Sequence, residues 1–380
     1  MTDPPDVTVL GAGIAGLACA IACASKGQSV EVIEQAPALT EVGAGLQIAP
    51  NGGRVLDALG VTPLSLNSEA VHLIDGTRGR SVIRMPVGPG FRMVHRADLI
   101  EALASRAASL GIRIRLNCQV VEIGAGARTV VLRDGTVRSV NRLVGADGAR
   151  GIARAFVVPD HAPRFTGQVA WRALVPVADA PTEAQVHMGP GRHLVCYPLR
   201  DGTVMNIVAV EEREDWVPAG WSHADDPDNL RAAFAGYARP IRALLDRVEQ
   251  THLWGLMDHG VTARWTRDAC TLIGDAAHPT LPFLAQGANL ALEDAWTVAH
   301  YWADPVEWER RRRPRVTRAL AAAQGNADRY HLSGTKREVA HAGLRLIARI
   351  APGLPLRGYD WLYGADATRN LPSDSKNGKQ

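Results

Sequence analysis

The sequence is poor in cysteine, and the few cysteines it has form no recognisable framework. Five occur in 380 residues, and no CxxC pair is among them. Cys19 and Cys23 are four positions apart, so they share one face of a helix as small apolar residues. This excludes a disulfide framework, and we expect a reduced, cytoplasmic protein with no metal site.

A strong excess of charge of either sign is also missing. The formal net charge is +3, which is too small to indicate a nucleic-acid partner. The densest basic run holds five arginines between positions 310 and 315 and follows Glu307 and Glu309. Such a mixture of charges predicts a solvated helix face. The apolar fraction of 46% is ordinary for a soluble globular protein of this length.

No hydrophobic run has the character of a membrane span or a targeting signal. Residues 7–25 contain no charged residue, but three spaced glycines interrupt them and no basic residue precedes them. A strand, a glycine turn and a buried helix explain this stretch better than a bilayer does. We therefore expect no membrane partner and no targeting segment.

The first third of the chain follows a strand–helix–strand order. Residues 7–10 read as a strand, 11–16 as a turn, 17–26 as a helix, and 30–34 as the next strand. Further helices are predicted at 50–59 and 96–110, each followed by a glycine, and short strands at 112–116, 120–123 and 129–132. This order predicts a parallel sheet of the doubly wound type.

From residue 165 to 265 the pattern changes to short strands, predicted at 168–175, 183–188, 193–198 and 204–210, with one long helix at 228–248. Strand 271–273 and helices at 287–303, 308–330 and 339–350 follow. We therefore predict an α/β fold in which a Rossmann-like domain (1–160 and 266–332) carries an inserted antiparallel β-sheet domain (161–265). A C-terminal helical segment (333–369) and a disordered polar tail (370–380) complete the chain.

The first motif is Gly11-x-Gly13-x-x-Gly16, between a strand and a helix. Gly11 permits the tight turn, Gly13 lets the backbone approach a pyrophosphate, and Gly16 allows close helix–sheet packing. The helix N-terminus presents free N–H groups to that anion. Glu34, at the end of the second strand, has the spacing of an acid that binds ribose hydroxyls. This combination predicts dinucleotide binding, against the alternative of a turn that serves packing alone.

Two later motifs narrow the identity of the bound cofactor. Gly145-Ala146-Asp147-Gly148 follows a strand, and Gly274-Asp275-Ala276-Ala277-His278-Pro279 precedes Pro282 and Gln286-Gly287-Ala288-Asn289. In this order and spacing the three motifs resemble the para-hydroxybenzoate hydroxylase class of FAD-dependent aromatic-ring hydroxylases. The likeness is greatest to the salicylate, 3-hydroxybenzoate and 6-hydroxynicotinate hydroxylases, and it extends over the chain to about residue 332.

The resemblance implies an FAD site. Asp275 would bind a ribityl or ribose hydroxyl, and the amides that open the helix at Gly287 would face the flavin pyrimidine edge. Asp147 would serve both FAD and NAD(P)H, although Asp-Gly is also a common turn. Gly151 stands where relatives often have serine, which puts a hydroxyl contact there in doubt. The predicted FAD-binding residues are Gly11, Gly13, Ala15, Gly16, Glu34, Gln35, Gly45, Leu46, Arg96, Val121, Asp147, Asp275, Gly287, Ala288 and Asn289.

For the substrate site the sequence offers a strand at 193–198. His193 and Tyr197 are four apart, so they point to the same face of that strand. With the resemblance, His193 is a candidate base for a phenol proton and Tyr197 a candidate for orienting the substrate, whereas the alternative is a pair of ordinary sheet residues. Pro282 and Gln286 complete the predicted catalytic set. Further predicted substrate contacts are Trp171, Arg172, His187 and Phe283, with Arg54 as an additional candidate.

Arg172 is equally suited to a substrate carboxylate and to a surface or interdomain salt bridge. The resemblance implies that NADH or NADPH reduces the flavin, that O₂ forms a C4a-hydroperoxide, and that one oxygen is transferred to a small aromatic ring. Only one GxGxxG follows a strand, so the nicotinamide cofactor is expected to bind transiently. Other flavin enzymes of this fold (oxidases, epoxidases) and a non-catalytic flavin sensor remain alternatives, and the sequence does not separate a monomer from a homodimer.

Overall fold

The computed structural model describes residues 4–39, 44–214, 222–369 and 371. Its first layer is a six-stranded sheet in the order β19-β20-β12-β1-β2-β8. The five strands from β20 to β8 are parallel and only β19 is antiparallel, which is the doubly wound pattern. The strands are β1 (Val7–Leu10), β2 (Val30–Ile33), β8 (Arg113–Arg115), β12 (Leu143–Gly145), β19 (Thr266–Arg267) and β20 (Cys270–Leu272).

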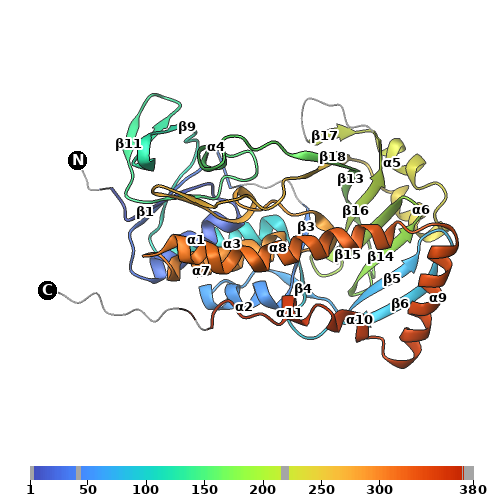
Figure 1. Cartoon of the computed structure of the whole chain (residues 1–380). Coiled ribbons are helices and arrows are strands. Elements are labelled where there is room, and N and C mark those ends of the chain that lie inside the picture. Colours follow the sequence, from blue (N-terminus) through green and yellow to red (C-terminus); the bar gives the residue numbers. More distant parts are fainter. Residues whose placement is uncertain (1–3, 40–43, 215–221, 370, 372–380) are drawn as a thin grey trace.

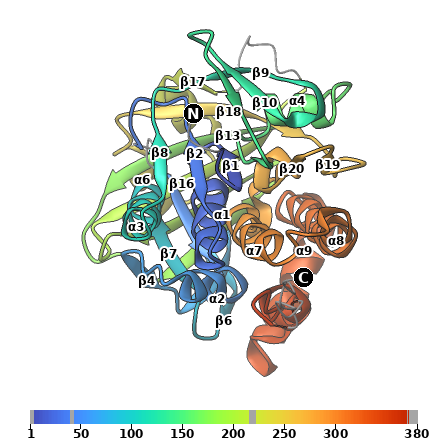
Figure 2. The same ribbon diagram turned by 90° about the vertical axis from the view of Figure 1, so that its left-hand side faces the viewer.

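Helix α1 (Ile14–Ser25) lies at the centre of this domain, between α3 (Arg96–Ser109) and α7 (Gly287–His300) (Figures 1 and 2). Nine of its residues are buried, because an uncharged helix can pack on all sides. Cys19 and Cys23 lie on one face with their sulfurs 4.0 Å apart. Among the described residues no helix has the length and apolar character that crossing a membrane requires.

The second layer is an eight-stranded sheet in the order β17-β18-β13-β16-β15-β14-β5-β6. Two of its strands, β5 and β6, come from residues 70–86 and thus lie outside the predicted segment 161–265; β5 pairs with β14 in parallel. The members are β5 (Ala70–Asp75), β6 (Arg80–Pro86), β13 (Arg164–Pro176), β14 (Glu183–Gly189), β15 (Arg192–Leu199), β16 (Val204–Glu212), β17 (Ser222–Asp225) and β18 (Thr251–Asp258).

One face of this sheet is covered by α5 (Pro227–Ala233) and α6 (Arg239–Leu245), and the other face looks toward the dinucleotide domain. The predicted single helix at 228–248 is wrong, because Pro240 in the first turn of α6 cannot continue a preceding helix. A three-stranded sheet of β3 (Gly45–Ile48), β7 (Arg92–His95) and β4 (Ser65–Asn67) connects the two layers. Another, of β9 (Val120–Ile123), β10 (Thr129–Leu132) and β11 (Val137–Ser139), lies at the periphery (Figure 1).

Helix α8 (Pro305–Tyr330) runs beside α7 and continues past it to the eight-stranded sheet (Figure 1). Helix α9 (Gly334–Ile350) then packs on β6. The remaining helices are α2 (Pro50–Leu59), α4 (Ile152–Val157), α10 (Leu354–Arg357) and α11 (Asp360–Tyr363). The predicted disordered tail lies, apart from Leu371, outside the described residues.

Candidate active site

The glycine turn and the start of α7 line one cleft. Gly13 and Ala15 from the glycine turn and α1 line it together with Gln286, Gly287 and Ala288 from the start of α7. Gly11 has a φ of +96°, and a Cβ there would lie 2.5 Å from the carbonyl oxygen of Ala146, so the turn requires glycine. A Cβ on Gly13, by contrast, would meet nothing within 4 Å. The backbone at Gly13 is therefore open to a ligand at the N-terminus of α1.

Glu34 is held by the backbone beside this turn. Its carboxylate accepts hydrogen bonds from the amides of Ala12 at 2.7 Å and Ala36 at 2.8 Å. Lone pairs of both oxygens remain for the hydroxyls of a ribose. Gln35 and Val121 are exposed beyond the residues that line the cleft, and their predicted contacts with the cofactor stay predictions.

Asp147 turns away from the cleft, although its neighbours Ala146 and Gly148 line it. Its carboxylate accepts a hydrogen bond from the amide of Ala153 at 3.0 Å, inside the first turn of α4. A Cβ on Gly151 would lie 2.0 Å from the Asp147 carboxyl carbon, so the glycine makes room for this conformation. Burial raises the pKa of Asp147 to about 6. This geometry supports the turn interpretation of Asp147, and its contact with a cofactor stays a prediction.

The middle of the cleft is charged. Arg96, Arg172 and Asp275 line both the cleft, of about 270 Å³, and an adjoining cavity of about 600 Å³. The protein packed around its carboxyl group raises the pKa of Asp275, although the residue is exposed, while His278 and nearby arginines oppose the rise. Arg172 is half-buried over the ring of Trp254, 5.2 Å from its centroid, and no carboxylate within the described part of the chain pairs with it. The interdomain salt bridge considered for Arg172 is therefore not found there.

The residues around the start of α7 are fixed by amide contacts. Asn289 accepts a hydrogen bond from the amide of Ala49 at 2.9 Å and donates to the carbonyl oxygens of Gln47 and Ala285. Its side chain thus ties β3 to α7. The Gln286 Oε1 accepts from Asn51 at 3.1 Å, while its buried Nε2 has no hydrogen-bond partner among the described residues. Gln286 therefore has a donor available to a ligand in the cleft.

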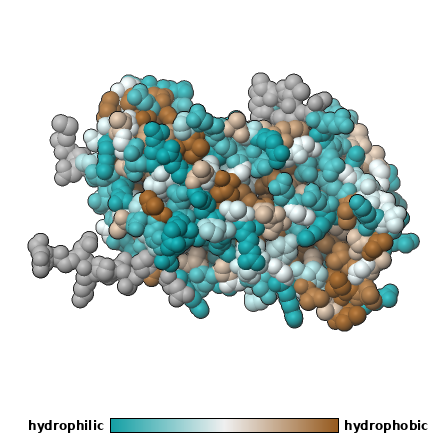
Figure 3. Space-filling model, in the orientation of Figure 1, coloured by the Kyte–Doolittle hydropathy of each residue, from teal (hydrophilic) through white to brown (hydrophobic). Residues whose placement is uncertain are grey.

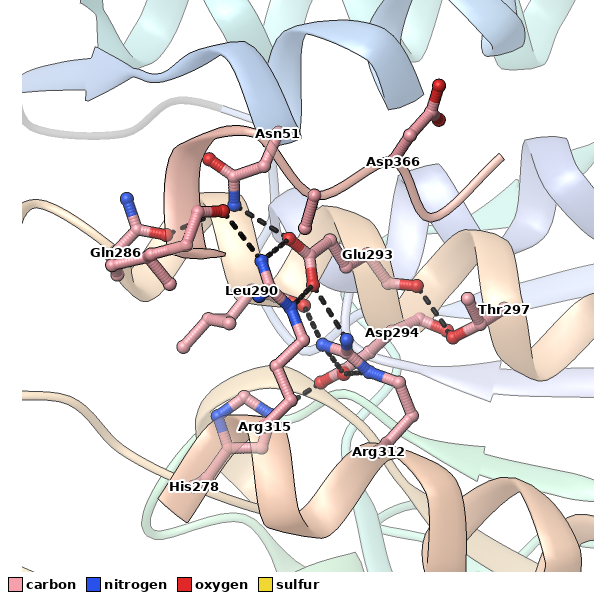
Figure 4. Close-up of polar contacts among 12 residues, drawn as sticks. Asn51, His278, Gln286, Leu290, Glu293, Asp294, Thr297, Arg312, Arg315 and Asp366 are labelled. Atoms are coloured by element: carbon pink, nitrogen blue, oxygen red, sulfur yellow. Dashed lines mark hydrogen bonds and ion pairs between the residues drawn. The ribbon is translucent and has the colours of Figure 1, made fainter. Parts of the chain in front are cut away.

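A network of buried ion pairs joins α7 to α8 (Figure 4). Glu293 accepts from Arg312 at 2.6 Å and from Arg315 at 2.7 Å, and Asp294 accepts from Arg312 at 2.8 Å. Burial alone would raise the pKa of Glu293, but the two guanidinium groups hold it below its usual value. The predicted solvated arginine face is thus wrong for Arg312 and Arg315, since α7 supplies buried carboxylates that need partners. Asp294 also lies 2.5 Å from His278 Nε2.

His193, Val195 and Tyr197 share the face of β15 that lines the cleft. His193 Nδ1 lies 2.7 Å from Nε2 of His331, and His331 Nδ1 lies 2.7 Å from Oε1 of Glu212. His193 and His331 are buried, whereas the Glu212 side chain is 53% exposed. Burial lowers the pKa of both histidines, most strongly that of His193. The three side chains therefore connect the cleft with solvent.

Three residues that were predicted to contact the substrate lie outside the cleft. Trp171 is on the far face of β13, where its Nε1 donates to Asp225 at 2.6 Å, because neighbouring residues of a strand point to opposite faces. His187 is on the far face of β14, 3.2 Å from Gln185. Arg54 donates to the carbonyl oxygens of Tyr363 and Ala365 in the C-terminal segment. None of the three contacts the cleft, so these predictions are wrong.

A second cavity, which we call the apolar chamber, adjoins the cleft. It has a volume of about 500 Å³ and shares Gln47, His193, Val195, Pro282 and Ala285 with the cleft. Phe283, a predicted substrate contact, lies in its wall with its ring 5.7 Å from that of His193. The sequence analysis did not single out His331 and Glu212, which form the hydrogen-bonded series with His193, and no motif marks either residue.

The cleft fits FAD on three observations of this chain. The open backbone at Gly13 suits a pyrophosphate, the carboxylate of Glu34 lies beside it, and the side-chain Nε2 of Gln286, which also lines the cleft, has no partner among the described residues. Gly45 and Leu46, two of the predicted FAD-binding residues, also line the cleft.

Comparison with known proteins agrees with this fit. A family model described as "FAD binding domain" matches residues 5–313. The 3-amino-4-hydroxybenzoate 2-monooxygenase PtnB3 of Streptomyces platensis is 33% identical over 96% of this chain and 97% of its own length. The 3-hydroxybenzoate 6-hydroxylase of Klebsiella oxytoca is 31% identical over 94% of this chain and 96% of its own length.

Among solved structures, a salicylate hydroxylase in complex with its substrate superposes with a TM-score of 0.79 at 22% identity, over 97% of each chain. HpxO of Klebsiella pneumoniae, solved with FAD and uric acid, gives a TM-score of 0.79 at 25% identity, over 93% of this chain and 95% of its own. The predicted fold class is confirmed by these neighbours. The chain belongs to the FAD-binding-domain family, and it is an FAD-dependent aromatic hydroxylase.

Proposed function

We propose that this hydroxylase acts on a phenol whose hydroxyl group hydrogen-bonds to Nε2 of His193. The observation that carries the proposal is the hydrogen-bonded series His193–His331–Glu212, which begins in the wall of the cleft and ends in solvent. FAD, when bound and reduced by NADH or NADPH, supplies the activation of O₂. The protein must make the ring electron-rich at the same place, and removing the phenol proton does this.

The direction of proton transfer follows from the tautomers. For His193 Nε2 to accept, its Nδ1 must carry the hydrogen that it donates to His331 Nε2, and His331 Nδ1 then donates to Glu212. A proton taken up at His193 can thus be passed to His331 and on to Glu212 without leaving a charge on the buried ring of His193. Because burial lowers the pKa of His193, holding the charge there would be costly.

Tyr197 and Gln286 are proposed to orient the substrate. Burial raises the pKa of Tyr197, so its hydroxyl stays protonated and can donate. Its ring is confined by Gly45, where a Cβ would lie 2.7 Å from Tyr197 Cε2. The free Nε2 of Gln286 is a second donor. Arg172, unpaired by any described carboxylate, is proposed to attract an anionic group to the charged part of the cleft.

The test is to load the protein with FAD and measure NADH and NADPH oxidation together with hydroxylated product for a panel of phenols. We expect product formation to fall by about 10²–10⁴-fold in His193→Ala, as is typical when an acid–base group is lost. His187→Ala is the matched control, because His187 is a buried histidine on the opposite face of the same sheet. Equal losses in both variants would end the proposal, as would NAD(P)H oxidation that yields no hydroxylated product with any phenol.

A further inference from the structure

The apolar chamber is formed by parts of the chain that lie outside the FAD cleft. Strands β5, β6 and β14 form one side, and the end of α8 with α9 and α10 forms the other. The chamber begins at His193 and Pro282, which also line the cleft. A ring held at His193 therefore has the cleft on one side and this chamber on the other.

The inner wall of the chamber is apolar. The side chains that set this character come from four elements: Val71, Leu73, Met85, Val186, Met188 and Leu344. No carboxylate is among the described residues that line it. Such a wall cannot replace the water around a charged substituent, so a charge in the middle of the chamber would be strongly disfavoured.

Among the described residues that line the chamber, three have side chains that can carry a positive charge. His193 marks its entrance from the cleft. Arg329 is exposed and donates to Asn326 at 3.4 Å, so its charge lies at the rim. His341 has Asp75 Oδ2 3.5 Å from its Nδ1, and burial lowers its pKa. The space between the entrance and the rim is thus without a free charge.

The volume of the chamber exceeds what a single ring needs. An apolar cavity of about 150 Å³ accommodates benzene, whereas this chamber measures about 500 Å³. A substrate that consisted of one hydroxylated ring would leave most of the wall without contacts. We infer that the substrate carries an uncharged, apolar substituent, such as an alkyl chain or a second ring, and that this substituent occupies the apolar chamber. The inference rests on the proposed function, since it assumes that the hydroxylated ring lies at His193.

The test is a binding series measured by calorimetry on the FAD-loaded protein without NADH or NADPH, so that no turnover occurs. Phenol is compared with its methyl, propyl and pentyl derivatives, substituted at position 3 or 4. We expect the Kd to fall by about fourfold for each methylene buried in at least one of the two positional series. A chain of the same length that ends in a carboxylate should lose this gain.

Helix α9 offers a matched pair of variants. Leu344 lies in the wall of the chamber, whereas Leu346 is 59% exposed on the outer side of the same helix. Ile350 and Leu354 are also exposed in this part of the chain, and Figure 3 shows a hydrophobic region around α9 and α10. Leu344→Trp should fill the chamber and reduce the affinity for pentylphenol at least tenfold, while the Kd of phenol itself stays within about twofold. Leu346→Trp should change neither.

If Leu344→Trp does not fold, Ala340→Leu gives a smaller filling of the same wall. Affinities that stay flat or weaken with chain length, or equal effects of Leu344→Trp and Leu346→Trp, would overturn the inference. Product analysis separates the two proposals. Chain-length-dependent binding without hydroxylation would contradict the role of His193 and leave the chamber as inferred, whereas hydroxylation of simple phenols without a chain-length gain would contradict the chamber alone.

Discussion

Two buried polar networks flank the ligand cleft, and they end in different ways. The network behind α7 balances Glu293 and Asp294 against Arg312 and Arg315, and its carboxylates are fully enclosed (Figure 4). The network from His193 to Glu212 contains two neutral rings and a single acid that reaches solvent. A closed, charge-balanced network suits a structural role that holds elements together, whereas an open and neutral one suits the proton transfer that we propose for His193.

The largest effect is expected from breaking the closed network. Arg312→Met leaves Glu293 and Asp294 without one of their cations, and we expect the free energy of unfolding to fall by about 3–5 kcal/mol. Urea denaturation followed by circular dichroism measures this. The control is Arg310→Ala, which removes only an exposed pair with Glu307 and should not change the midpoint measurably. A loss of hydroxylation in Arg312→Met without loss of stability would contradict the structural role.

A substitution in the open network should slow the reaction rather than lower the free energy of unfolding. His331→Asn keeps a polar side chain but cannot accept and donate along the series, so we expect hydroxylation to slow by roughly tenfold, less than for a group that contacts the substrate. Binding of the phenol should change little. The release of the phenol proton to bulk solvent, followed with a pH indicator, should slow by the same factor and should recover when free imidazole is added. Unchanged proton release would show that the proton leaves by another route.

The pH dependence gives a finer test. Burial lowers the pKa of His331, so the ring is neutral at pH 7 and can accept a proton; at lower pH it becomes protonated and hydroxylation should fall. Because the folded pKa values of His193 and His331 lie below 6.5, the unfolded chain binds more protons below that pH. The free energy of unfolding should therefore decrease as the pH falls below about 6.5, and this decrease should be shallower in His331→Asn.

The smallest effect is expected at the exposed end. Glu212 opposes the lowering of the His331 pKa, so Glu212→Gln should lower that pKa further and make His331 a weaker base. We expect hydroxylation at pH 7 to slow by about two- to fivefold, and its acidic limit to move to lower pH. The pH profile of kcat measures both shifts. Glu211→Gln, which alters a neighbouring carboxylate paired with Arg192 and Arg213, should leave the acidic limit in place.

The sequence predicted the parts of the site that depend on local geometry. The glycine turn follows from backbone sterics, and the common face of His193 and Tyr197 follows from the two-residue period of a strand. The same period would have excluded Trp171, since Arg172 next to it already faces the cleft. Buried Glu293 and Asp294 in an apolar helix were a signal that Arg312 and Arg315 are partners, which the surface interpretation of the arginine run overlooked.

Other parts could not be read from the chain because they depend on long-range pairing. His331 is 138 positions from His193, and nothing at the end of a helix distinguishes it from an ordinary exposed histidine. Strands β5 and β6 join the large sheet through a parallel pairing of β5 with β14, more than 100 positions away. Such contacts are fixed by tertiary packing, so local sequence patterns do not predict them.

Helix α8 sets the spacing between the two networks. It carries Arg312 near one end and is followed at the other by His331. At 1.5 Å per residue the two positions are separated by roughly 28 Å along one helix. Insertion of one residue between them would rotate His331 by about 100° relative to Arg312, so both side chains could no longer meet their partners at once. The number of residues between Arg312 and His331 is therefore constrained. Substitutions in this part of the chain should be tolerated far more readily than insertions or deletions.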